Sequence, residues 1–277
     1  MDEVNAKRAK FALIYMAVIM SVVFSIWNVL LNNFAVEKVE FTGSDMGDLQ
    51  SFRELPGFLA FTAVFVLLFM REQTLAIFAL FLLSVGVLAT GYFPTKVRLI
   101  ATTLVMSIGF HYFETINTSL TLQWLSKEEA PSFLVKVIGC SSLAGLIAYG
   151  AVWLATAVLK LDYVVIYSTT GVIGIAMVIH LWKIFPNIEG LIPQRKNLFL
   201  KKKYSVYYVL TFLKGARRQI FMVFAAFLLV EKFDYTLAEV TTLYLINKGA
   251  IIVIAPLIGK IIEKIGERRA LTFKYIG

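Results

Sequence analysis

The stretch YYVLTFLKGARRQIFMVFAAFLL, residues 207–229, decides how the rest of the chain is interpreted. It is apolar at both ends and long enough to cross a bilayer, since about 20 helical residues span the ~30 Å hydrocarbon core. Lys214, Arg217 and Arg218 nevertheless lie inside it. A charged side chain near the bilayer centre costs at least ~2.5–3.5 kcal/mol on insertion scales. We therefore expect these side chains to face a protein interior or a water-filled cavity that other helices enclose.

The composition of the whole chain agrees with a polytopic membrane protein. Of its 277 residues, 59% are hydrophobic and 16% are charged, whereas soluble domains carry about 25% charged residues. The single cysteine, Cys140, excludes an internal disulfide framework, and His111 and His180 lie too far apart for a common metal-binding motif. The sequence thus predicts an all-α polytopic membrane protein without a metal or a cofactor.

Apolar runs predict eight membrane spans and the beginning of a ninth. The polar segment 35–56 contains several acidic residues, glycines and a proline, and we expect it to be a solvated outer loop. The predicted spans run over residues 11–34, 57–71, 74–93, 97–121, 133–158, 163–184, 206–230 and 238–262.

A long basic segment, residues 185–205, divides these spans into two groups. We expect residues 1–184 to form an N-terminal six-helix transmembrane bundle, residues 185–205 a cytoplasmic linker, and residues 206–277 the incomplete start of a C-terminal bundle. Placing the N-terminus inside puts most lysines and arginines on the cytoplasmic side, as the positive-inside rule requires. This placement accounts for the net charge of +9 without a nucleic-acid partner, and it predicts a bacterial inner (cytoplasmic) membrane location.

The segment GKIIEKIGERRAL, residues 259–271, follows the eighth predicted span. It resembles the loop motif G-x-x-x-D-[RK]-x-G-[RK]-[RK] of the major facilitator superfamily, with Glu263 in place of the aspartate and Glu267 in place of a base. The tight turn at residues 71–73 lacks the first copy of that motif and keeps only Arg71. The residues that match the motif are Gly259, Glu263, Gly266, Arg268 and Arg269.

The resemblance implies two six-helix bundles and secondary active transport of a small solute by alternating access, as a symporter or an antiporter. Since the chain ends inside the ninth predicted span, a member of that family would need further helices. We therefore expect the chain to be a C-terminally truncated fragment. The expected partners are a small-molecule solute, the lipid bilayer and, for coupling, protons.

Several polar residues lie deep inside the predicted spans and are candidates for binding solute. Arg217 lies about 12 residues into its span, which corresponds to ~18 Å and the bilayer midplane. Arg218 points about 100° away from it, so we expect one arginine to face the cavity and the other a neighbouring helix. Lys248 lies at a similar depth and either binds solute or pairs with a helix beyond the chain. Asn28 and Asn247 complete the candidate set.

His111 and Glu114 are three residues apart, and a helix places them on one face. Glu114 is the one acidic residue deep inside a predicted span. An imidazole and a carboxylate can both titrate near neutral pH when their surroundings shift them, which favours proton coupling. Glu114 could equally neutralise Arg217, Arg218 or Lys248. The small residues Gly139, Gly145 and Gly150 of the fifth span predict tight helix packing.

Two other function classes were weighed against a carrier. A non-transporting scaffold or receptor derived from a transporter fold is the alternative, supported by the missing first loop motif and by the expected truncation. An enzyme would need clustered histidines, paired carboxylates or a nucleophile motif at a membrane face. The sequence shows no such constellation, so we expect no enzymatic activity. A net anionic or polar organic solute fits the excess of deep cationic groups.

Overall fold

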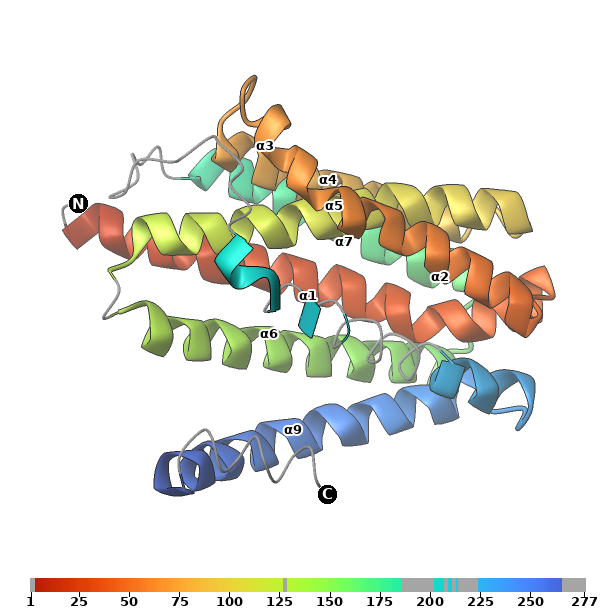
Figure 1. Cartoon of the computed structure of the whole chain (residues 1–277). Helices are drawn as coiled ribbons and strands as arrows, with labels where there is room; N and C mark the ends of the chain where they lie inside the picture. The colour runs from red at the N-terminus through yellow and green to blue at the C-terminus, as the bar shows by residue number, and fades with distance from the viewer. Residues whose placement is uncertain are drawn as a thin grey trace.

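The chain folds into long helices that run side by side (Figure 1). The computed structural model describes residues 3–126, 129–185, 202–206, 209–210, 213 and 224–265, with the backbone alone at 255–265. Five segments are long and apolar enough to cross a membrane: Val4–Val39, Glu72–Thr90, Lys96–Trp124, Ser132–Val158 and Tyr163–Ile184. The protein is a multi-pass membrane protein, and the all-helical fold class is confirmed. Most of residues 206–223, including Lys214, Arg217 and Arg218, lie outside the described residues.

The apolar runs become helices close to their predicted ranges. The helix Tyr163–Ile184 has the bounds predicted for the sixth span, because Asp162 caps its N-terminus and its apolar run ends at Ile184. The long helices are α1 (Glu3–Val39), α4 (Glu72–Thr90), α5 (Lys96–Trp124), α6 (Ala130–Trp153), α7 (Tyr163–Ile184) and α9 (Leu237–Ile265), and the π-helical turn η2 (Leu154–Val158) extends α6.

The prediction of a solvated loop at residues 35–56 is wrong. Helix α1 continues to Val39, and α2 (Gly43–Phe58) occupies most of the segment. A capping box starts α2, in which Thr42 and Asp45 exchange hydrogen bonds at the helix N-terminus. Met46 and Leu49 form a buried apolar stripe on α2, and α2 packs on α5. The acidic residues and glycines that indicated a loop lie on a half-buried helix.

The second predicted span, residues 57–71, is correspondingly not one straight helix. Pro56 lies in the last turn of α2, and the chain continues as the 3-10 helix η1 (Leu59–Thr62) and the short α3 (Ala63–Val66). Proline has no N–H group and clashes with the preceding turn, which disfavours continuation of a straight α-helix. The break lies next to the middle of α5, where Tyr112 and Thr62 share a hydrogen bond.

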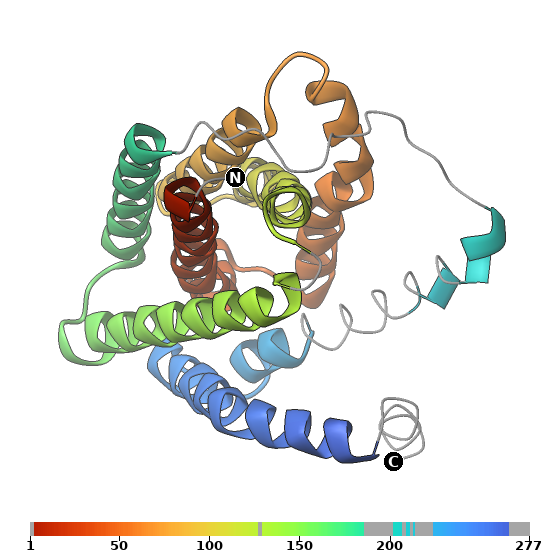
Figure 2. The same ribbon diagram turned by 90° about the vertical axis from the view of Figure 1, so that its left-hand side faces the viewer.

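Helix α1 is the centre of the fold. It contacts α4, α5, α6, α7 and α9, and its residues Met16, Ile19, Trp27 and Leu30 are fully buried. Figures 1 and 2 show α6 between α1 and α9, so that α9 covers α6 from outside. Helices α4, α5 and α7 lie on the opposite side of α1.

Helix α4 approaches both α5 and α7 at backbone distance. A Cβ built on Gly86 of α4 would lie 2.5 Å from the Met106 backbone nitrogen of α5. One built on Gly174 of α7 would lie 2.5 Å from the Ser84 hydroxyl of α4. Small residues permit this close approach of helices in membranes. Of the three glycines of α6 for which the sequence predicts tight packing, Gly145 lies against α1, where a built Cβ would be 3.2 Å from the hydroxyls of Ser21 and Ser25. Gly139 and Gly150 have no described neighbour within 4 Å of a built Cβ.

Candidate functional site

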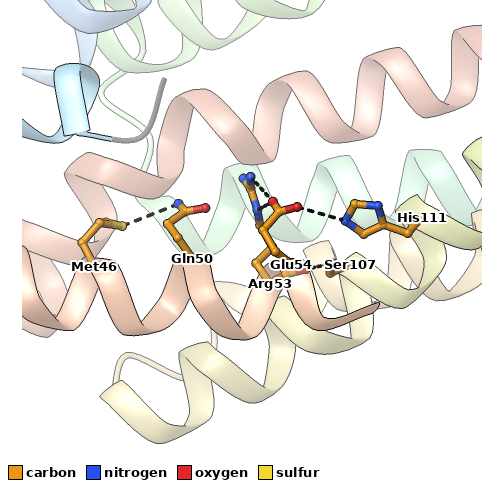
Figure 3. Close-up of polar contacts among 6 residues, drawn as sticks. All are labelled: Met46, Gln50, Arg53, Glu54, Ser107 and His111. Atoms are coloured by element: carbon orange, nitrogen blue, oxygen red, sulfur yellow. Dashed lines mark hydrogen bonds and ion pairs between the residues drawn. The ribbon is translucent and has the colours of Figure 1, made fainter. Parts of the chain in front are cut away.

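Three charged or titratable side chains meet where α2 crosses the middle of α5 (Figure 3). Arg53 of α2 donates from Nη2 and Nε to Glu54 Oε1, at 2.7 Å and 3.1 Å. The other carboxylate oxygen, Oε2, lies 3.8 Å from Nε2 of His111 in α5. The side chains of Arg53 and His111 are only 14% and 17% exposed, whereas Glu54 is 41% exposed. We call Arg53, Glu54 and His111 the central cluster.

The local sequence explains why the imidazole lies against α2. A Cβ on Gly57 would be 2.7 Å from Cε1 of His111, so only glycine leaves room for the ring at this point. The Ser107 hydroxyl, one turn earlier on α5, donates to the Arg53 carbonyl and fixes the two helices in register. Gln50, one turn from Arg53, is buried, and its Oε1 has no partner among the described residues.

A second group of polar side chains faces the central cluster from α1, α6 and α9. Asn28 of α1 donates from Nδ2 to the Tyr244 hydroxyl of α9, at 3.5 Å. The rings of Tyr244 and Tyr149 of α6 meet edge to face, with centroids 5.3 Å apart. Arg53 interacts electrostatically with Tyr244, which joins this group to the central cluster. The two groups together contain a cation, an anion, an imidazole, an amide and two phenol hydroxyls.

Lys248, one turn beyond Tyr244, lies over Gly145 of α6. A Cβ on Gly145 would be 3.8 Å from Cε of Lys248 and 3.2 Å from the hydroxyl oxygens of Ser21 and Ser25. The side chain is half-buried. Within the part of the chain that the structure describes, Lys248 has no hydrogen bond or ion pair.

The structure separates some residues that the sequence grouped together. His111 contacts Glu54 of α2, whereas Glu114 is exposed one turn further along α5, and its carbonyl accepts from Thr118. Asn28 and Lys248 lie in the central region, and Asn247 is exposed. The backbone of Gly259 and Glu263 lies in the last turns of α9. The other predicted site residues lie outside the described residues: Arg217, Arg218, Gly266, Arg268 and Arg269.

Sequence reasoning missed Arg53 and Glu54 because it placed them in a solvated loop. Two signals could have found them. Thr42 and Asp45 have the spacing of a capping box, and Met46, Leu49 and Arg53 follow it at helical spacing. Glu54, which lies outside the predicted spans, is the carboxylate beside His111. Among the described residues, no group of three or more histidine, cysteine, aspartate or glutamate side chains could hold a metal ion.

Solved structures with this fold are known, although no family model and no curated protein matches the sequence. The D323A mutant of the nucleoside transporter NupG has a TM-score of 0.72 at 12% identity, over 93% of this chain and 69% of that one. A bacterial homologue of the human lysosomal transporter Spinster has a TM-score of 0.65 at 13% identity, over 97% and 64%. PepTSo2 has a TM-score of 0.52 at 12% identity, over 98% and 58%.

At these identities the likeness shows the fold. The chain has the fold of the major facilitator superfamily transporters and spans about two thirds of the length of the NupG and Spinster-homologue chains. The fold-class prediction, six helices followed by the first helices of a second bundle, is confirmed. These structural neighbours are transporters rather than enzymes.

Proposed function

We propose that the protein is a secondary transporter that moves a small anionic or polar organic solute by alternating access around the central cluster. The observation that carries this proposal is the Arg53–Glu54–His111 arrangement, enclosed between helices in the middle of α5. Ionisable side chains at membrane depth are expensive to bury, and they are retained mainly on solute or proton pathways. The fold supports the same class of function.

The proposed organisation follows the sequence analysis. Residues 1–184 form the first bundle, residues 185–205 a cytoplasmic linker and residues 206–277 the start of the second bundle. The N-terminus is cytoplasmic in a bacterial inner membrane, so the Val39 end of α1 faces outward. Gly259, Glu263, Gly266, Arg268 and Arg269 act as a conformational loop motif at the inner end of α9. Arg217 and Arg218 remain proposed solute ligands.

Contacts at the Val39 end of α1 support alternating access. Asn33 of α1, fully buried, donates from Nδ2 to the carbonyl of Tyr235, which lies just before α9. Glu37 orients that amide by accepting from it at 3.2 Å, and Glu37 also accepts from the Tyr163 hydroxyl of α7 at 2.9 Å. We call Asn33, Glu37, Tyr163 and Tyr235 the outer network. It joins the two proposed bundles on the outer side, as an inward-facing carrier requires.

Proton coupling is proposed at Glu54 and His111. Arg53 holds one oxygen of Glu54, and the other oxygen faces the imidazole. A proton on His111 would strengthen its attraction to Glu54 and weaken the hold of Glu54 on Arg53. Arg53 would then be free to bind the solute. This exchange links protonation to solute binding within one cluster, with Glu114 one turn away along α5.

The proposal is tested by transport with the full-length protein in proteoliposomes that contain a pH dye. The solutes are carboxylates, sugars, organic cations and nucleosides, the last because NupG is a nucleoside transporter. We expect at least one solute to drive proton movement, and Glu54→Gln and His111→Asn to abolish it. Glu129→Gln is the matched control, because this exposed carboxylate just before α6 pairs, among the described residues, with Lys10 of α1 alone. Solute binding without any uptake would contradict the proposal and favour a receptor or scaffold.

A further inference from the structure

Lys248 is a cation of the central region. Among the residues that the structure describes, no acidic side chain forms an ion pair with it. Arg53 is balanced by Glu54 at 2.7 Å, whereas Lys248 has no ion pair within the described residues. It lies about 11 residues after Leu237, or ~16 Å along α9. An uncompensated charge at such depth is costly and marks a site where an opposite charge binds. The group that balances Lys248 must therefore carry a negative charge.

The surroundings of Lys248 indicate what carries that negative charge. Gly145 has no side chain, so Lys248 lies close against α6 at this point, and the hydroxyls of Ser21 and Ser25 of α1 lie beside the same glycine. One turn away, the Tyr149–Tyr244 ring pair supplies an apolar wall, and Asn28 supplies an amide. A single lysine suits a carboxylate, since phosphate is generally bound by several cations or by the forked guanidinium of arginine. The aromatic wall favours an organic body over a small inorganic anion.

We propose that Lys248 binds the carboxylate of a small organic anion, whose neutral part lies against Tyr149 and Tyr244. This assignment rests on the proposed function and names the solute class of that site. Arg53 and Glu54 pair with each other at 2.7 Å, which leaves Lys248 as the described cation of the region that can hold the carboxylate.

The test is ligand-induced thermal stabilisation of the purified full-length protein in detergent at constant ionic strength. Benzoate, benzamide and benzylamine have the same ring and differ in charge. We expect benzoate to raise the melting temperature, since a ligand that binds only the folded state stabilises it. Benzamide and benzylamine should have little effect. Absence of a benzoate shift, or a larger shift with benzylamine, overturns the inference.

Two variants locate the bound carboxylate. Lys248→Gln should weaken benzoate binding by about tenfold or more, since truncating one partner of an enclosed charge pair costs several kcal/mol. Lys136→Gln, an exposed lysine on α6, should leave it unchanged. Gly145→Val places a branched side chain against Ser21, Ser25 and Lys248 without changing charge and should also weaken binding. Gly150→Val, in open space among the described atoms, should not. Equal binding by wild type and Lys248→Gln overturns the inference.

The result separates this inference from the transport proposal. Lys248-dependent benzoate binding in a protein that moves no solute would leave the anion site intact and remove the carrier function. Glu54-dependent uptake of a cation, without Lys248-dependent benzoate binding, would keep the carrier function and remove the anion site. The melting temperatures of the unliganded variants, together with their elution as single species, show whether each variant is folded.

Discussion

The α4–α5–α7 side of the molecule and the α6–α9 side are joined in different ways. Helix α4 meets α5 and α7 backbone to backbone, with a glycine at each close approach. Helix α9 meets α1 and α6 through side chains: Tyr244 on Asn28, Tyr244 on Tyr149, and Lys248 over Gly145. Backbone contacts of the first kind cannot slide without clashes, because packed interiors have little free volume. The comparison indicates that the α4–α5–α7 side is rigid and that α9 can separate from α1 and α6.

The rigid side should tolerate a larger residue least. Gly86→Val places a branched side chain against the Met106 backbone, where a Cβ already lies within 2.5 Å of the nitrogen. We expect it to lower the free energy of unfolding by about 3 kcal/mol, the upper range for overpacking. Thermal unfolding in detergent and the yield of folded protein measure the loss. Gly150→Val, with no described neighbour within 4 Å, should behave like wild type, and equal losses in the two variants would contradict the comparison.

The movable side should respond in conformation rather than in folding. Asn33→Ala removes the hydrogen bond to the Tyr235 carbonyl and destabilises the outer network by about 1–3 kcal/mol. We expect the outward-open state to become more populated. With Cys140→Ser as background, a cysteine at Gln50 reports access of a membrane-impermeant thiol reagent from outside.

The control for that measurement is Asn247→Ala, which changes an exposed asparagine of α9. Faster labelling in Asn33→Ala but not in Asn247→Ala supports the movable interface. Unchanged labelling in both variants would mean that the outer network does not hold the outer side closed.

A polar contact inside the rigid side should affect stability alone. Glu72, at the start of α4, is buried and accepts from Ser119 at 2.7 Å and from Gln123 at 2.6 Å, both on α5. Glu72→Gln places an amide group opposite the amide donor of Gln123 and should lower the free energy of unfolding by about 1–2 kcal/mol. Thermal unfolding checks it against Glu129→Gln, an exposed pair worth ~1 kcal/mol or less. Altered labelling at Gln50 in Glu72→Gln would show that this side also moves.

The smallest expected effect is a pH dependence at the N-terminal end of α2. Hydrogen bonds from Lys96 and Thr42 lower the pKa of the Asp45 carboxyl from 3.8 to about 2. Because the folded pKa lies below the unfolded one, the stabilisation is fully present above about pH 4 and is lost as the pH falls toward 2. The melting temperatures of wild type and Asp45→Asn should differ by a constant amount above about pH 4.5 and converge below it. A difference that grows in acid would contradict this assignment, and Asp48→Asn is the control on the same helix.

The sequence predicted most of the long helices, and the reason is hydropathy. The apolar runs of α4, α5, α6, α7 and α9 are uninterrupted enough to locate each helix within a few residues. Helix α1 begins eight residues before its predicted span and ends five residues after it. Helix α2 was missed because a search for apolar runs does not find a helix with polar residues on one face. Such a face is tolerated within a membrane protein where it faces the protein interior. Arg53 and Glu54 of α2 are charged, which hid the helix from a hydropathy search, and the same charge makes them candidates for binding solute or protons.

The candidate site was predicted in part. Depth along a helix located Asn28, His111 and Lys248, since each needs only a count of residues from the span end. Depth could not pair His111 with Glu54, because that contact depends on how α2 crosses α5 at Gly57. Close packing at Gly86 and Gly174 escaped prediction for a similar reason. A glycine becomes a packing site only when a neighbouring helix lies opposite it, and the sequence does not state which helices are neighbours.

The most direct test of alternating access is a pair of spin-label distances in lipid nanodiscs, on a Cys140→Ser background. One pair joins Ser44, at the start of α2, to Lys232, between the helical residues 224–231 and α9; both residues are exposed. The other joins Tyr92 to Leu161 across the rigid side. We expect Asn33→Ala to lengthen or broaden the 44–232 distance and to leave the 92–161 distance unchanged. A 44–232 distance that stays single and unchanged in that variant would contradict a carrier that opens at this end.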